Sequence, residues 1–186
     1  MHRIFSKKQI LTLPNLLSLL RLLMIPLILW LYLVRHAYFE TVTVLLLSGI
    51  TDVADGILAR ATDTVSDFGK ILDPIADKCT QGALILCLGI RYPLMNLLII
   101  LFLLKETGQA ILGLWALKKR DTVNSAKWYG KANTVLLYAV TTLLILFPNL
   151  RFGVANGLIL LCCAACILSF VLYARFYFRF FKQKDR

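Results

Sequence analysis

Six aspartates lie close together in the stretch TDVADGILARATDTVSDFGKILDPIADK, which covers residues 51–78. The whole chain of 186 residues has only ten acidic residues, and the sequence on both sides of this stretch is strongly apolar. The six are Asp52, Asp55, Asp63, Asp67, Asp73 and Asp77. An aspartate at the centre of a membrane span costs roughly 2.5–3.5 kcal/mol. Acids concentrated in such a place indicate a functional site.

The spacing of four of these acids predicts two pairs on helices. Asp52 and Asp55 are three residues apart, and Asp73 and Asp77 are four apart, so each pair shares one helical face. Two adjoining antiparallel helices can therefore point four carboxylates into one pocket.

Such a pocket needs positive charge. Arg60, Lys70 and Lys78 are near in sequence, but we expect them to extend toward the cytoplasm. Hard divalent cations fit better, and carboxylate oxygens favour Mg²⁺ or Mn²⁺. Two such ions held by shared carboxylates can clamp a phosphate or pyrophosphate during a displacement reaction.

The neighbouring residues are compatible with a bound ligand. Gly56 and Ala59 are small and leave room for a ligand or a close helix contact, and Arg60 is placed to meet a phosphate or a base edge. Two other interpretations remain at this point. The acids could belong to a polar helix pair buried in a bundle, or to an ion-conducting or proton-relay site.

The elements that position these acids are predicted to be transmembrane helices. Hydrophobic residues make up 59% of the chain and its mean hydropathy is +0.76, whereas about 45–50% is usual for soluble proteins. We expect an all-α integral membrane protein with six spans, in which an amphipathic juxtamembrane segment (1–13) precedes one transmembrane domain (14–186). The spans are expected near 15–34, 41–61, 71–90, 94–117, 131–148 and 154–178.

The charge pattern predicts the orientation of the chain. The formal net charge is +11, and the basic residues cluster in alternate connections between the apolar segments. The positive-inside rule then places both termini in the cytoplasm, which an even number of spans also requires. This pattern argues against a nucleic-acid-binding protein. We expect no cleavable signal peptide, and the five cysteines are expected to act as small apolar side chains.

The complete pattern Asp52-x2-Asp55-Gly56-x2-Ala59-Arg60-x8-Gly69-x3-Asp73-x3-Asp77 resembles the signature of the CDP-alcohol phosphatidyltransferases. The resemblance implies a transferase of phospholipid biosynthesis that holds a CDP-linked lipid through two divalent cations, Mg²⁺ or Mn²⁺. An acceptor hydroxyl attacks the lipid-side phosphorus and CMP leaves. The resemblance thus favours an enzyme over a cation or proton transporter.

The same resemblance implies roles for individual residues. Asp52, Asp55 and Asp73 would bind metal, and Asp77 would be the general base with partial metal contact. Asp63 and Asp67 fall outside the pattern. Asp63 could help to bind the nucleotide, but it is expected to be a solvated loop acid. The residues implied to bind CDP are Gly56, Ala59, Arg60 and Gly69.

Two further stretches resemble the branch of this family that makes phosphatidylglycerol phosphate, and the related cardiolipin synthases. They are LDPIADK (72–78) and LPNLLSLLRLLMIP (13–26), which carries Asn15, Ser18, Arg21 and Pro26 at matching places. The expected substrates are therefore CDP-diacylglycerol and sn-glycerol 3-phosphate. Phosphatidylglycerol, inositol and inositol phosphate remain alternative acceptors. Asn15, Arg21 and Glu106 are expected to support the structure or a substrate.

Three lysines are candidates for binding the acceptor's phosphate. Lys105 interrupts the fourth span together with Glu106, so it either meets that phosphate or forms a supporting salt bridge. Lys127 and Lys131 lie in SAKWYGKANT (125–134), which resembles the opening of the fifth span in relatives that use glycerol phosphate. They could equally be ordinary inside-positive charges. A further basic residue often follows in such relatives, where this chain has Asn133.

Two expectations concern the setting of the enzyme. Gly153 and Gly157 form a small-xxx-small pair that could mediate a homodimer contact. The resemblance further implies the bacterial cytoplasmic membrane, with the active site facing the cytoplasm.

Overall fold

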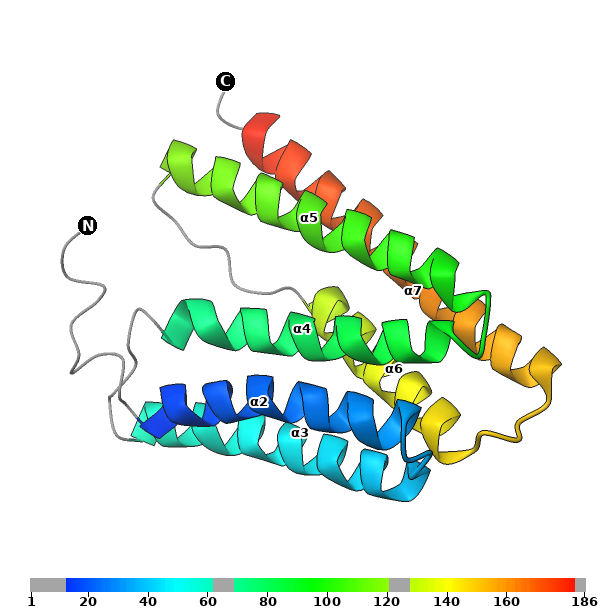
Figure 1. Ribbon diagram of the computed structural model, residues 1–186. Helices are drawn as coiled ribbons and strands as arrows, with labels where there is room; N and C mark the ends of the chain where they lie inside the picture. The colour runs from blue at the N-terminus through cyan, green and yellow to red at the C-terminus, as the bar shows by residue number, and fades with distance from the viewer. Residues whose placement is uncertain (1–12, 62–68, 121–127, 183–186) are drawn as a thin grey trace. The chain divides into compact units, whose positions relative to one another are not determined.

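The protein is described by a computed structural model of the whole chain. The backbone is described for residues 13–61, 69–120 and 128–182, and the side chains for residues 15–51, 69, 72–113 and 128–177. All regular structure in these residues is α-helical (Figure 1). The helices are α2 (Leu13–Leu33), α3 (Tyr38–Ala61), α4 (Gly69–Gly89), α5 (Met95–Arg120), α6 (Trp128–Leu146) and α7 (Phe152–Lys182).

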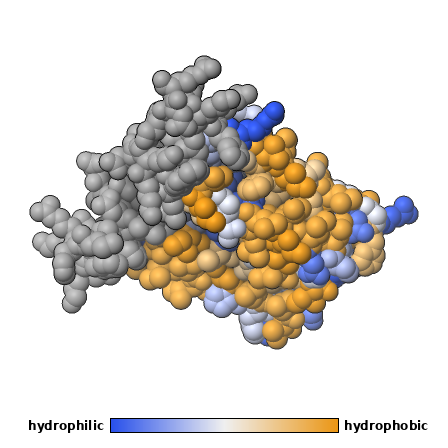
Figure 2. All heavy atoms as spheres, turned by 90° about the horizontal axis from the view of Figure 1, so that it is seen from above, coloured by the Kyte–Doolittle hydropathy of each residue, from blue (hydrophilic) through white to orange (hydrophobic). Residues whose placement is uncertain are grey.

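The six helices lie where the apolar segments predicted them. Four of them contain a stretch long and apolar enough to cross a membrane: Asn15–Leu33, Met95–Gly113, Trp128–Leu146 and Phe152–Tyr177. In the most apolar part of each stretch, no more than 33% is buried inside the protein, so most of it faces outward. Figure 2 shows the same property, since apolar side chains cover most of the described surface in that view. Apolar surface of this extent indicates an integral membrane protein.

Helices α3 and α4 differ from the other four in polarity. The described part of α3 has a shorter apolar stretch, Tyr38–Thr51. Helix α4 is continuous, but polar residues that follow Leu72 interrupt its apolar sequence. The predicted amphipathic segment at 1–13 lies almost entirely outside the described residues.

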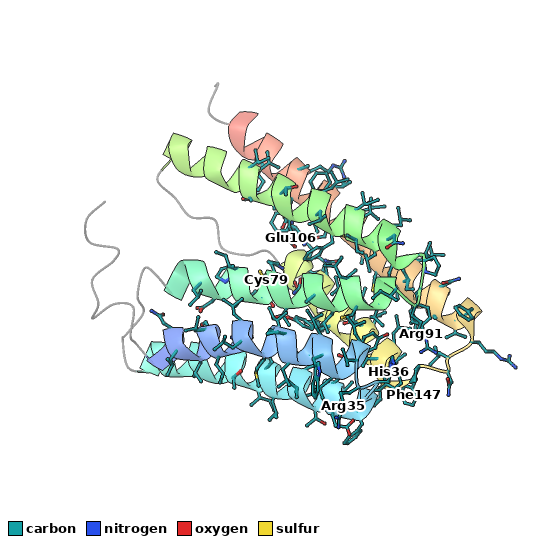
Figure 3. All side chains as sticks on the ribbon, in the orientation of Figure 1. Arg35, His36, Cys79, Arg91, Glu106 and Phe147 are labelled. Atoms are coloured by element: carbon teal, nitrogen blue, oxygen red, sulfur yellow. The ribbon has the colours of Figure 1, made fainter. Side chains whose placement is uncertain are left out.

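The chain divides into two compact units, Met1–Cys87 and Leu88–Arg186, with the boundary inside the last turn of α4. In the first unit, α2 and α3 pack side by side (Figure 1). The turn between them contains His36, whose φ of 50° reverses the chain after the last turn of α2. The guanidinium of Arg35, labelled beside His36 in Figure 3, lies 5.3 Å from the ring centre of Trp30.

In the second unit, α7 packs against both α5 and α6. Helices α5 and α7 run parallel. Tyr92, just before α5, contacts Phe152 at the start of α7. Toward the other end, Gly113 of α5 lies near Tyr177 of α7. The loops at the Tyr92 end are joined by Arg91, whose Nη2 donates to the carbonyl of Pro148 at 2.6 Å. Figure 3 shows Arg91 and Phe147 at this end.

The cysteines are all free. Cys87, Cys162, Cys163 and Cys166 are buried among apolar side chains, as expected for small apolar residues. Cys79 lies on the exposed side of α4.

Candidate active site

Asp73 is held by a contact from a different helix. It lies on the second turn of α4 and is half-buried. The hydroxyl of Ser18, on α2, donates a short hydrogen bond to its Oδ1. Ser18 itself is fully buried, with 0% of its surface exposed. One oxygen of the Asp73 carboxylate is therefore fixed by α2, some 55 residues away in the chain.

Helix α2 presents several polar side chains to the interior around this contact. Asn15 and Arg21 are each 3% exposed, and they precede and follow Ser18 by three residues. Steps of three residues keep side chains on neighbouring positions of one helical surface. The Arg21 side chain thus lies in the interior of the first unit. Burial of a polar group without a partner is costly. We therefore expect these three buried side chains to contact other polar groups inside the protein.

Asp77 lies one turn after Asp73 and is oriented from its own helix. Gln81 Nε2 donates to Asp77 Oδ2 at 3.2 Å, and Gln81 is 1% exposed. Lys78 Nζ lies 3.5 Å from the same oxygen and 3.3 Å from Gln81 Oε1. The Asp77 side chain keeps 28% of its surface exposed. The carboxylate is thus anchored through Oδ2 and still accessible.

Lys78 contacts one of the acids directly. Its ammonium lies 3.5 Å from Asp77 Oδ2. The physical reason is the bridge through Gln81, which lies three residues along α4 and accepts from Lys78 while donating to Asp77. Lys78 therefore offsets part of the negative charge on α4.

The first acid pair is described only as backbone. Residues 52–61 are helical as part of α3, so Asp52 and Asp55 share one face of that helix. Their side chains, and those of Gly56, Ala59 and Arg60, lie outside the description. Asp63 and Asp67 also lie outside it. Gly69 is described: it begins α4 and is buried.

The described acids have the chemistry that a hard divalent cation requires. Asp73 and Asp77 offer carboxylate oxygens about one helical turn apart, and each is bound through one named oxygen. Within the described side chains, no group of three or more histidines, cysteines or acids gathers in a way that could hold a metal ion. Asp52 and Asp55, the expected further ligands, are not among those side chains. The carboxylate oxygens of Asp73 and Asp77 are donors of the kind that Mg²⁺ and Mn²⁺ prefer.

Lys105 and Glu106 form an ion pair inside the second unit. Lys105 Nζ lies 2.5 Å from Glu106 Oε1, and the side chain of Lys105 is 3% exposed. Glu106 is labelled on α5 in Figure 3. Of the two roles weighed for this lysine, the supporting bridge is the one that the contact favours. Burial of the ammonium is tolerable because the carboxylate partner is so close.

The other acceptor candidates are placed only in part. Lys131 is exposed on the first turn of α6, whereas Lys127 lies outside the described residues. Asn133, which stands where relatives often have a basic residue, is 5% exposed. The structure thus brings no cluster of basic side chains together among the described residues of this region.

Two residues that contact the acids are not predicted by the aspartate pattern. Ser18 belongs to a stretch that resembles relatives, and Gln81 lies outside the motifs described above. Each leaves a usable signal: Ser18 lies midway between Asn15 and Arg21, and Gln81 lies four residues after Asp77.

Comparison with known proteins gives the family. A model of the CDP-alcohol phosphatidyltransferase family matches residues 11–174, which is most of the chain and includes both acid pairs. The chain belongs to the CDP-alcohol phosphatidyltransferase family. The resemblance that the aspartate pattern indicates is thereby confirmed as membership of this family. The chain spans well under two thirds of the length of several relatives that it matches.

Individual relatives carry two different names. The chain is similar to a protein of Aquifex aeolicus named CDP-diacylglycerol–glycerol-3-phosphate 3-phosphatidyltransferase, at 35% identity over 67% of this chain and 70% of the relative. It is 32% identical to a probable phosphatidylglycerophosphate synthase of Mycobacterium tuberculosis, over 71% of this chain and 65% of the relative. It is also 42% identical to a fusion protein of a CMP-forming cardiolipin synthase and a mitochondrial hydrolase from Schizosaccharomyces pombe. That match covers 46% of this chain and only 14% of the fusion protein.

Proposed function

We propose that this protein transfers the phosphatidyl group of CDP-diacylglycerol to sn-glycerol 3-phosphate, forming phosphatidylglycerol phosphate and CMP. The observation that carries the proposal is the pair of anchored and accessible carboxylates on α4, Asp73 and Asp77, within the signature of the family. The glycerol 3-phosphate acceptor is supported by the two relatives that align over about two thirds or more of this chain.

In the proposed reaction, Asp77 acts as the general base. Its Oδ2 is engaged by Gln81 and Lys78, so the base is held in place while part of its surface stays accessible. It accepts the proton of the acceptor hydroxyl as that oxygen bonds to the lipid-side phosphorus of CDP-diacylglycerol. The bond from this phosphorus to the bridging oxygen breaks, and CMP leaves with the electron pair.

The remaining roles follow from the family signature. Asp52, Asp55 and Asp73 would hold two divalent cations, Mg²⁺ or Mn²⁺, with partial contact from Asp77. When bound, these ions offset charge on the pyrophosphate and on the departing CMP. Gly56, Ala59, Arg60 and Gly69 would contact the CDP group. Lys127 and Lys131 would receive the acceptor's phosphate, and Lys105 would contribute mainly through Glu106.

The setting of the enzyme is part of the proposal. Six spans, cytoplasmic termini, a single catalytic domain over 14–186 and a site facing the cytoplasm of a bacterial membrane agree with the charge pattern and the family. The homodimer is proposed through α7, where Gly153 and Gly157 are exposed and a Cβ on either would meet no described atom within 4 Å.

The test is product analysis with the purified protein, CDP-diacylglycerol and Mn²⁺. Glycerol 3-phosphate, phosphatidylglycerol, inositol and inositol phosphate are offered separately, and the lipid product is identified by its mass. The proposal expects phosphatidylglycerol phosphate from the first acceptor. A product formed only from phosphatidylglycerol would instead establish cardiolipin synthesis, the activity named for the Schizosaccharomyces pombe relative. Inositol-dependent product would likewise overturn the proposed acceptor.

A further inference from the structure

The hydrogen bond between Ser18 and Asp73 is the feature that goes furthest beyond the family signature. It joins α2 to α4, and it connects a residue outside the aspartate pattern with a carboxylate inside it. Ser18 is fully buried, so its hydroxyl has been withdrawn from water and is used inside the protein.

The geometry of the bond determines what it can do for Asp73. The serine donates to Oδ1, which fixes the rotation of the carboxylate. Oδ2 is the other oxygen of the carboxylate. A carboxylate held in this way presents its second oxygen in one direction, as outer contacts of metal ligands commonly do.

The surroundings of Ser18 support this role over a simple packing contact. Asn15 and Arg21 are buried on the same surface of α2, so this part of the span is built as a polar surface next to the acids. A different buried serine shows the contrast. Ser169, on α7, is 2% exposed, and its hydroxyl has no hydrogen-bond partner among the described residues.

We propose that Ser18 is a positioning residue that orients Asp73 for binding a divalent cation, so that α2 completes a metal site whose carboxylates come from other helices. This inference rests on the proposed function, because it assumes that Asp73 is a metal ligand. It assigns to the first span a part in metal affinity in addition to membrane anchoring.

The experiment measures the binding of Mn²⁺ to the purified full-length protein. Binding is detected as a decrease of the free Mn²⁺ signal in electron paramagnetic resonance. Ser18→Ala is expected to weaken Mn²⁺ binding about tenfold or more. Ser18→Thr retains the hydroxyl donor and is expected to restore most of the affinity. Ser169→Ala is the matched control, since it removes a buried serine hydroxyl that contacts no carboxylate, and it should bind Mn²⁺ like the wild type.

Three results would overturn the inference. Equal Mn²⁺ affinity in Ser18→Ala and the wild type would leave the bond as a packing contact. A second such result is that Ser18→Ala both binds Mn²⁺ weakly and unfolds at a lower temperature, and that Ser18→Thr recovers neither property. Ser18 would then be a residue needed for folding. Wild-type protein that binds no Mn²⁺, with Asp73→Asn indistinguishable from it, would refute the proposed metal site itself, and this pattern differs from the other two.

Discussion

The two units of the chain differ in what their buried polar side chains contact. In the first unit, the buried Ser18 and Gln81 each donate to a carboxylate that remains partly accessible. In the second unit, the buried Lys105 is matched by the neighbouring Glu106, and the buried Thr141 donates to carbonyls of its own helix. Burial of polar groups has a similar energetic cost in both places. The partners in the first unit are acids that we propose to bind a ligand, whereas the partners in the second unit are groups that stabilise the fold.

The largest effect that this comparison predicts is on Asp77. Asp77→Asn keeps the side chain's shape but removes the base, so CMP release should fall by about 10²–10⁴-fold. Mn²⁺ affinity should change much less, because the other expected ligands remain. The measurement pairs the rate of CMP release with Mn²⁺ binding. A variant that retains substantial turnover would exclude Asp77 as the base.

A smaller loss of activity is expected when Gln81 is changed. Gln81→Leu preserves bulk in the core but removes the hydrogen bond from Gln81 to Asp77 Oδ2, so turnover should fall about tenfold. Thr80→Val is the control on the adjacent residue, because Thr80 is buried and its hydroxyl donates to the carbonyl of Ala76 in the same helix. Equal turnover of the two variants would mean that Gln81 contributes only packing.

The second unit should respond in stability. Glu106→Gln leaves the Lys105 ammonium buried without its charged partner. The free energy of unfolding should fall by about 2–3 kcal/mol, somewhat less than for a fully buried pair because Glu106 keeps 20% exposure. Thermal unfolding in detergent measures the change.

A double variant sharpens the same test. Lys105→Met combined with Glu106→Leu removes both charges and should recover most of the lost stability, since the cost comes from an isolated buried charge. If Glu106→Gln were as stable as the wild type but failed to make product with glycerol 3-phosphate, Lys105 would belong to the acceptor site after all.

The smallest predicted effect concerns glycine packing in the second unit. A Cβ at Gly108 would lie 2.7 Å from Cε2 of Phe170, so Gly108→Ala should destabilise the α5–α7 contact by about 1 kcal/mol. Gly49→Ala, on α3, meets no described atom within 4 Å and should be neutral or slightly stabilising, because alanine is the better helix former. Thermal unfolding of the two variants compares them directly. Equal stabilities would contradict the close packing at Gly108.

The helices and the acid pattern were predictable from the sequence for physical reasons. Long apolar segments have to form helices in a membrane, because their backbone groups have no other hydrogen-bond partners there. The observed bounds of α2 and α4, Leu13–Leu33 and Gly69–Gly89, therefore lie close to the expected 15–34 and 71–90. Placing a charged side chain in such a segment is energetically costly, so charged residues there indicate a candidate functional site. Asp73 and Asp77 are two such residues.

The contacts within the site were harder to predict. Ser18 is separated from Asp73 by 55 residues, and no periodicity within α2 shows which residue of another helix it meets. Lys105 and Glu106 are adjacent, and adjacent residues on a helix do not normally face each other. Their contact depends on the long lysine side chain folding back toward the carboxylate. The bridge from Lys78 to Asp77 likewise depends on Gln81, which carries no charge to attract attention.

The central claim is that the acids on α3 and α4 form a metal-dependent phosphatidyltransferase site. Its most direct test is CMP release by the purified wild-type protein from CDP-diacylglycerol and glycerol 3-phosphate, before and after removal of divalent cations by a chelator. The account predicts that release stops on chelation and returns when Mg²⁺ or Mn²⁺ is added in excess. Release that continues unchanged in protein freed of divalent cations would contradict it.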